Sequence, residues 1–139
     1  MDLLSGASFQ RLEGAIKAAS LRQQVLANNV ANVDTPNFKR SDVVFEDLLA
    51  QAMSSDAGPS PGFAGIRTDD RHIPVGGTSS PVPSARIVTE ESTRINNSRN
   101  NVDIDKEMAL LAENQLRYNL YAQQINHEIK MMRIGIKGQ

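Results

Sequence analysis

The sequence of 139 residues predicts a mainly α-helical fold, with long N- and C-terminal helices that form an antiparallel coiled-coil-like pair. Near both ends, apolar residues recur at spacings of three and four, as they do on one face of a helix. Between them, residues 54–83 hold 5 Gly, 5 Pro and 5 Ser, a composition typical of loops. The middle of the chain is therefore expected to be loop-rich and to hold at most a small β-hairpin.

The N-terminal helix is expected to end near Val33, because Pro36 disfavours helical backbone at Thr35. Three asparagines lie close to this end, although Asn is a poor helix former, so their amides are expected to make contacts. The apolar seam of this helix has one polar interruption and consists of Phe9, Leu12, Ile16, Ala19, Gln23, Leu26, Val30 and Val33.

The middle begins with a short amphipathic helix, expected from about Val43 to Met53 and capped by Ser41 or Asp42. Residues 54–83 have too few large apolar side chains to order by themselves, and a hairpin is expected from 72–75 and 86–89. These boundaries divide the chain into an N-terminal part (1–53), a loop region (54–100) and a C-terminal assembly helix (101–139). The first and last parts are expected to form one helical domain.

The C-terminal helix is expected to be capped by Asn100 or Asn101 and to carry acidic residues at its start and basic residues at its end. Gln115 interrupts its seam as Gln23 interrupts the first seam. Two readings stay open: the two amides are buried and fix the register of the helices, or both are solvated at a loose seam. The seam consists of Ile104, Met108, Leu111, Gln115, Tyr118, Ala122, Ile125, Ile129, Met132 and Ile136.

Each long helix carries a second stripe on its opposite face. In the first helix it consists of Gly14, Ala18, Leu21, Val25, Asn28 and Asn32, and in the last of Leu116, Leu120, Gln123, His127, Met131 and Ile134. A two-helix hairpin buries only one stripe per helix, and the short helix could cover only one end of one stripe. Self-assembly or packing against a partner is therefore favoured over a closed monomeric bundle.

Composition excludes several classes of protein. The formal net charge of −1 and the scattered basic residues argue against nucleic-acid binding. The absence of Cys excludes disulfides and thiolate sites. No run of 18 apolar residues predicts membrane insertion, and the N-terminus does not read as a cleavable secretory signal. The chain is expected to be either cytoplasmic or exported by a route without such a signal.

No group of residues predicts catalysis, a metal site or a cofactor. Asp69, Asp70 and His72 lie on a Pro- and Gly-rich stretch without the support that a metal site needs. Asp103 and Asp105 lack the glycine and distal glutamate of a calcium loop and fit a helix N-terminus better. His127 has no acidic partner on its helix face and is expected to be a polar interface residue.

Two segments carry a family resemblance. LANNVANVDTPNFKR, from Leu26 to Arg40, resembles the N-terminal motif shared by bacterial flagellar rod and hook proteins. NNVDIDKEMALLAENQLRYN, near the C-terminus, is similar to the more specific signature of the proximal rod subunits in that family. Asn37 stands where many of these proteins have Gly, and Asn tolerates left-handed backbone. Ser98 and Arg99 stand where the family often has Asp-Gly.

The resemblance implies a non-enzymatic structural subunit of the flagellar rod, which self-assembles through its terminal helices into the drive shaft that transmits torque. The implied partners are further copies, other rod subunits, the rod-adapter protein and the membrane-embedded ring at the rod base. Export by the flagellar type III apparatus, without a cleaved signal, would bring it to the rod in the periplasm. The alternative is a cytoplasmic coiled-coil export chaperone or adaptor.

The residues expected to form the assembly interface come from both long helices and from the two motifs. They are Leu21, Val25, Leu26, Asn28, Asn29, Val30, Asn32, Thr35, Pro36, Asn101, Val102, Asp103, Met108, Leu111, Leu116, Tyr118, Leu120, Ile125, Ile129 and Ile134.

Overall fold

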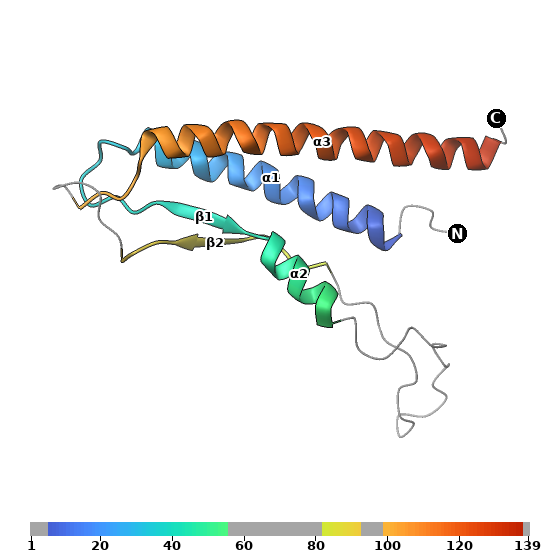
Figure 1. The fold of residues 1–139 in the computed structure, drawn as a ribbon, viewed down its shortest axis with the longest axis horizontal. Coiled ribbons are helices and arrows are strands. Elements are labelled where there is room, and N and C mark those ends of the chain that lie inside the picture. The colour runs from blue at the N-terminus through green and yellow to red at the C-terminus, as the bar shows by residue number, and fades with distance from the viewer. Residues whose placement is uncertain (1–5, 56–81, 93–98, 138–139) are drawn as a thin grey trace, which may run out of the picture.

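The computed structural model describes residues 6–55, 82–92 and 99–137. Its elements are α1 (Ala7–Ala31), β1 (Ser41–Val44), α2 (Glu46–Ser55), β2 (Arg86–Thr89) and α3 (Ile104–Lys137). The two long helices run antiparallel along the length of the molecule, and the two strands pack against α1 (Figure 1). This arrangement confirms the mainly helical fold with a small β element. The candidate metal residues Asp69, Asp70 and His72 lie outside the described residues.

The first helix ends two residues earlier than expected, at Ala31. Asn32 closes it, because its backbone N–H donates to Asn28 O and Asn29 O at 3.2 and 3.1 Å. A tight turn through Thr35 and Pro36 follows, with Asn37 in the left-handed region at φ 61°, as expected for the residue that replaces Gly. The proline and the turn thus stop the helix as the sequence indicates.

The stretch from 41 to 44 is a strand, so the prediction that a helix begins at Val43 was wrong. Two successive valines favour extended backbone, and contacts from α1 hold the strand in place. Val43 is 3% exposed, and its carbonyl accepts a hydrogen bond of 2.9 Å from Arg22 Nη2. The short helix α2 begins later, at Glu46, and runs to Ser55.

The hairpin prediction was right about residues 86–89 and did not foresee their partner. β2 pairs antiparallel with β1, with Ser41 opposite Thr89 and Val43 opposite Ile87. The other predicted strand, 72–75, lies outside the described residues. The sheet therefore joins a segment that precedes the loop region to one that lies within it.

The cap of α3 is Asp103, and the prediction of Asn100 or Asn101 as the cap was wrong. The Asp103 carboxylate accepts from the backbone N–H groups of Asp105 and Lys106 at 3.1 and 3.4 Å. Asn100 and Asn101 are instead buried and bind the segments around the end of α1.

The predicted seam of α3 is right at half of its positions. Leu111, Tyr118, Ala122, Ile125 and Met132 are half-buried as expected, but the fully buried positions of this helix are Glu107 and Asn114. These lie one residue before Met108 and Gln115, which are exposed. Gln23 is exposed too, so both glutamines are solvated in the single chain and their role in register between copies stays a prediction.

The apolar core of the described residues is small and lies where α1, β1 and the start of α3 meet. Its buried members are Ala18, Ala19, Val25, Leu26, Val43, Phe45 and Val102. Gly14 lets the segment before β2 pass close to α1, because a Cβ there would lie 2.9 Å from Val82 Cγ1. None of the helices described here has the length and apolar character that a membrane span requires.

Candidate functional site

A cluster of buried polar side chains joins the end of α1 to the start of α3. We call it the polar cluster and define it as Asn29, Arg40, Asn100, Asn101 and Glu107. Four of the five residues are at most 1% exposed, and the Arg40 side chain is 12% exposed. Because buried polar groups need partners, each member is held by several hydrogen bonds.

Asn29 is the central amide of the three near the end of α1. Its Oδ1 accepts from Ser41 N at 3.0 Å, and its Nδ2 donates to Ser41 O at 2.8 Å and to Glu107 Oε2 at 2.9 Å. One side chain therefore connects α1, β1 and α3. Its helical neighbours differ, since Asn28 is exposed and Asn32 bonds within its own turn, to Asn28 O and Thr35 Oγ1.

Asn100 and Asn101 hold the turn between α1 and β1. Asn100 Nδ2 lies 2.9–3.0 Å from the carbonyl oxygens of Asn32, Val33 and Thr35, and its Oδ1 accepts from Val102 N at 2.7 Å. Asn101 accepts from Arg40 N at 2.7 Å and donates to Glu90 O at 2.8 Å. The two adjacent amides thus satisfy backbone groups at the carboxyl end of α1 and at the end of β2.

The charges of the polar cluster belong to Arg40 and Glu107. Arg40 Nε donates to Glu107 Oε1 at 2.9 Å, and its other nitrogens lie 3.4 and 3.5 Å from Glu90 and Asp42. Burial acts to lower the pKa of Arg40, but the hydrogen bond to Glu107 and the nearby carboxylates outweigh it, and the pKa is raised. Arg40 therefore stays charged, and its bond to Glu107 holds the segment before β1 against α3.

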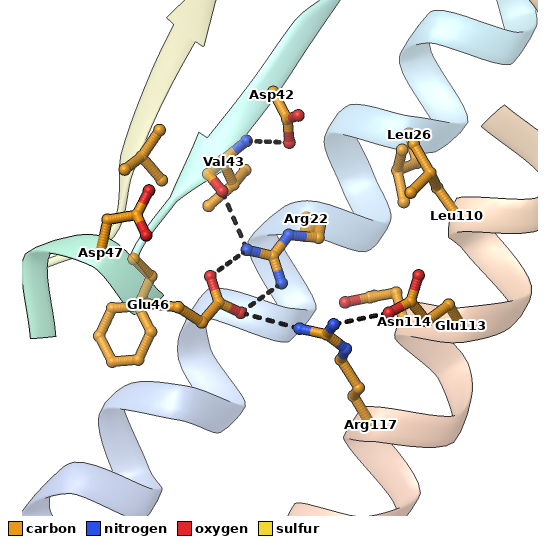
Figure 2. Close-up of a pocket in the computed structure, with 12 residues that line it drawn as sticks. Arg22, Leu26, Asp42, Val43, Glu46, Asp47, Leu110, Glu113, Asn114 and Arg117 are labelled. Atoms are coloured by element: carbon orange, nitrogen blue, oxygen red, sulfur yellow. Dashed lines mark hydrogen bonds and ion pairs between the residues drawn. The ribbon is translucent and has the colours of Figure 1, made fainter. Parts of the chain in front are cut away.

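A second polar site, which we call the notch, is a cavity of about 280 Å³ between α1, α3 and the β1–α2 corner (Figure 2). At its centre Arg22 donates to both oxygens of Glu46, at 2.8 and 2.5 Å, and Arg117 lies 3.4 Å from the same carboxylate. The hydrogen bond from Arg22 is the main reason why the pKa of Glu46 is lowered. Its lining consists of Arg22, Leu26, Asp42, Val43, Val44, Phe45, Glu46, Asp47, Leu110, Glu113, Asn114 and Arg117.

The last turns of α3 extend past α1, and we call residues 128–137 the overhang. Asn29 bonds Glu107 and Asn114 bonds Ala19, and this antiparallel register places Ala7 about level with residue 127. Figure 1 shows α3 continuing beyond the start of α1. Four of its large apolar side chains are exposed by 40–68%, and they are Ile129, Met131, Ile134 and Ile136.

The residues expected at the assembly interface fall into three groups. Five are buried within the chain: Val25, Leu26, Asn29, Asn101 and Val102. Six are half-buried: Leu21, Val30, Asn32, Leu111, Tyr118 and Ile125. Nine are exposed and available to another molecule: Asn28, Thr35, Pro36, Asp103, Met108, Leu116, Leu120, Ile129 and Ile134.

Sequence reasoning missed several residues of the two polar sites, among them Arg22, Arg40, Glu107 and Asn114. Glu107 was assigned to the helix dipole, yet it is buried and binds Arg40. The sequence contains a usable signal for these residues. Arg22 lies between the two apolar stripes of α1, and Glu107 and Asn114 lie seven positions apart beside the apolar seam of α3. Polar residues at such heptad spacing indicate a partner across the seam.

Comparison with known proteins decides the family. A family model described as "Flagella basal body rod protein" matches residues 9–39. The "Flagellar basal body rod protein FlgB" of Bacillus subtilis is 37% identical over 138 residues, covering 99% of this chain and 98% of that protein. The chain belongs to the FlgB family of flagellar basal body rod proteins. FlgB proteins of Borreliella burgdorferi (38% identity, 85% of this chain and 87% of that protein) and Salmonella typhimurium (28%, 95% and 94%) are also similar.

Family membership confirms the resemblance and makes the chain a structural component of the flagellar basal body rod. No finding favours the chaperone alternative. The match to the family model covers nearly all of α1 and its turn, and it includes Asn29 of the polar cluster. In this member of the FlgB family, the motif therefore has an internal role, which is to join α1 to β1 and α3.

Proposed function

We propose that this chain is a non-enzymatic subunit of the proximal part of the rod and that it assembles through its terminal helices into the drive shaft that transmits torque. Residues 1–53 and 101–139 act as one helical assembly domain, and 54–100 form the connecting region. Its partners are further copies, other rod subunits, the rod-adapter protein and the membrane-embedded ring at the rod base. It reaches the periplasm through the type III export apparatus without a cleaved signal.

The observation that carries this proposal is the apolar face of α3 opposite α1. Leu116 and Leu120 are 71% and 62% exposed, and Met131 and Ile134 continue the face at 54% and 40%. Full burial of each such side chain is worth roughly 1.5–3 kcal/mol. Two such pairs on one free helix face, separated by Gln123 and His127, favour association, because exposed apolar surface marks an interaction site.

The nine exposed interface residues are proposed to make these contacts directly. The eleven buried or half-buried ones contribute by holding the helices in the geometry that presents them. Asn28 is the exposed amide near the end of α1 that can meet a neighbour, since its Oδ1 accepts only a long bond of 3.5 Å from Asn32 whereas Asn29 and Asn32 are engaged more closely within the chain.

The test replaces Leu116 and Leu120 together by lysine in cells that depend on this chain for motility. The matched control places two lysines on the flank of the same helix, at Ala112 and Asn119, which are also exposed. We expect the leucine variant to keep its helicity and thermal melting midpoint but to be missing from purified basal bodies, with motility lost. The control should assemble. Normal assembly of the leucine variant would contradict the proposal.

A further inference from the structure

One buried polar atom of the described residues has no partner. Asn114 is 2% exposed, and its Nδ2 donates to Ala19 O at 2.8 Å, while its Oδ1 accepts no hydrogen bond. Buried acceptors are rarely left unpaired in native proteins. Asn114 lines the notch, and Figure 2 shows its side chain reaching from α3 toward the Arg22–Glu46 pair. Asn114 Oδ1 is shielded from solvent, so the groups that stay open to a partner are the charged side chains around it.

The lining of the notch indicates which kind of side chain from a partner would bind there. Four carboxylates and two guanidinium groups line it, which gives a net charge of −2 at neutral pH. Leu26, Val43 and Leu110 provide apolar wall beside these polar groups. A volume of about 280 Å³ lies at the small end of the range for ligand sites, roughly 300 Å³, and suits one side chain better than a helix or a cofactor. A cation on an apolar stem, which is lysine or arginine, fits all three properties.

The same molecule carries such side chains at its other end. Lys130, Arg133 and Lys137 are exposed on the overhang, and their spacing of three and four puts them on one helix face. Ile129 and Ile134 line the same surface hollow and could pack against the rim of a partner. The overhang of one copy and the notch of another therefore match in both charge and apolar character.

We propose that a lysine or arginine of the overhang enters the notch of a second copy and pairs with its carboxylates. The contact cannot form within one chain, because Glu113 at the notch and Lys137 are separated by about 36 Å along a single helix. It joins two different surfaces, and head-to-tail contacts of this kind build open helical filaments. The inference rests on the proposed function and names the surfaces that meet in it.

Cross-linking tests the contact directly, because the chain contains no cysteine. One sample carries Glu113→Cys and a second, of different tag size, carries Arg133→Cys or Lys137→Cys. The samples are mixed and treated with a short bismaleimide. We expect a mixed dimer at roughly ten times the yield obtained with Lys106→Cys, an exposed lysine near the other end of α3. If Arg133→Cys, Lys137→Cys and Lys106→Cys gave equal yields of mixed dimer, the inference would be overturned.

Charge reversal provides a second test that leaves the fold intact, since all the altered side chains are exposed. Arg133→Glu with Lys137→Glu should lower the mixed-dimer yield of Lys130→Cys with Glu113→Cys about tenfold, the change expected for loss of a charged hydrogen bond. Ala112→Lys with Asn119→Lys, exposed positions on the flank of α3 that line neither surface, should leave the yield unchanged. An unchanged yield for the charge-reversed chain would also overturn the inference.

The same cysteine pairs, expressed in cells, separate this inference from the proposed function. If the chain is present in purified basal bodies and the cysteines do not cross-link there, only the notch contact is wrong. If the chain is absent from basal bodies, the proposed function itself fails. A cross-link within the rod supports both.

Discussion

Replacing Glu107 by alanine tests whether the polar cluster holds the two helices together. Glu107 is fully buried, and each of its oxygens accepts one hydrogen bond of 2.9 Å, from Arg40 and from Asn29. Removing one member of a buried ion pair typically costs about 3–5 kcal/mol. Arg40 keeps its weaker contacts with Glu90 and Asp42, so we expect the lower end of this range, about 3 kcal/mol.

The assay is urea unfolding of the purified chain followed by circular dichroism. With a slope of about 2 kcal/mol per molar, a loss of about 3 kcal/mol lowers the urea midpoint by about 1.5 M. Glu13→Ala is the matched control, because Glu13 forms an exposed ion pair with Lys17 one turn away. That change should cost no more than about 0.5 kcal/mol.

A double variant separates the ion pair from the general effect of a cavity. Arg40→Met with Glu107→Met replaces both charges by apolar side chains, and such replacements are often nearly neutral. We therefore expect the double variant to lose less than the sum of the two single variants. A Glu107→Ala midpoint that differs from wild type no more than the Glu13 control would refute the reasoning.

Two further predictions concern the notch and the turn before α3. The lowered pKa of Glu46 means that folding favours its charged form, so its contribution is complete above the ordinary value of 4.5 and is lost as the pH falls through the lowered folded pKa. Glu46→Gln should thus lower the urea midpoint modestly at pH 7, and the two midpoints should converge in acid; a gap independent of pH would contradict this. Arg99 has φ 61°, and left-handed backbone costs a non-glycine residue about 1–2 kcal/mol. After the entropy that glycine adds to the unfolded chain, Arg99→Gly should stabilise the fold by about 0.5–1 kcal/mol, and a lower melting temperature than wild type would rule this out.

The helices could be predicted because their signals are local. The 3–4 periodicity located α1 and α3 to within a few residues, and the Thr-Pro pair marked the stop of α1. The exposed stripe of α3 was also correct, since Leu116, Leu120, Met131 and Ile134 are all exposed. These properties depend only on helix geometry and on the amphipathic pattern of one segment.

The sheet and the buried polar positions of α3 could not be predicted, because the residues that they contact are distant in sequence. Val43 and Val44 fit either a helix or a strand, and the choice depends on β2 and on Asn29. The seam of α3 was misplaced by one residue at Glu107 and Asn114, because pattern reading prefers an apolar neighbour such as Met108 to a buried charge. Such a charge becomes acceptable only when its partner, here Arg40, is known.

The residues of the polar cluster lie far apart in the sequence. This separation limits the order in which the contacts of the fold can form during synthesis. Asn29 and Glu107 are 78 positions apart, so a chain growing from its N-terminus holds Asn29 long before its partner exists. At 5–20 residues per second, synthesis of that interval takes about 4–16 s. During this time Asn29 can bond Ser41 but not Glu107, and α1 has no contact with α3. The nascent chain must therefore wait unpaired until α3 is made, and its folding is in effect a post-translational event.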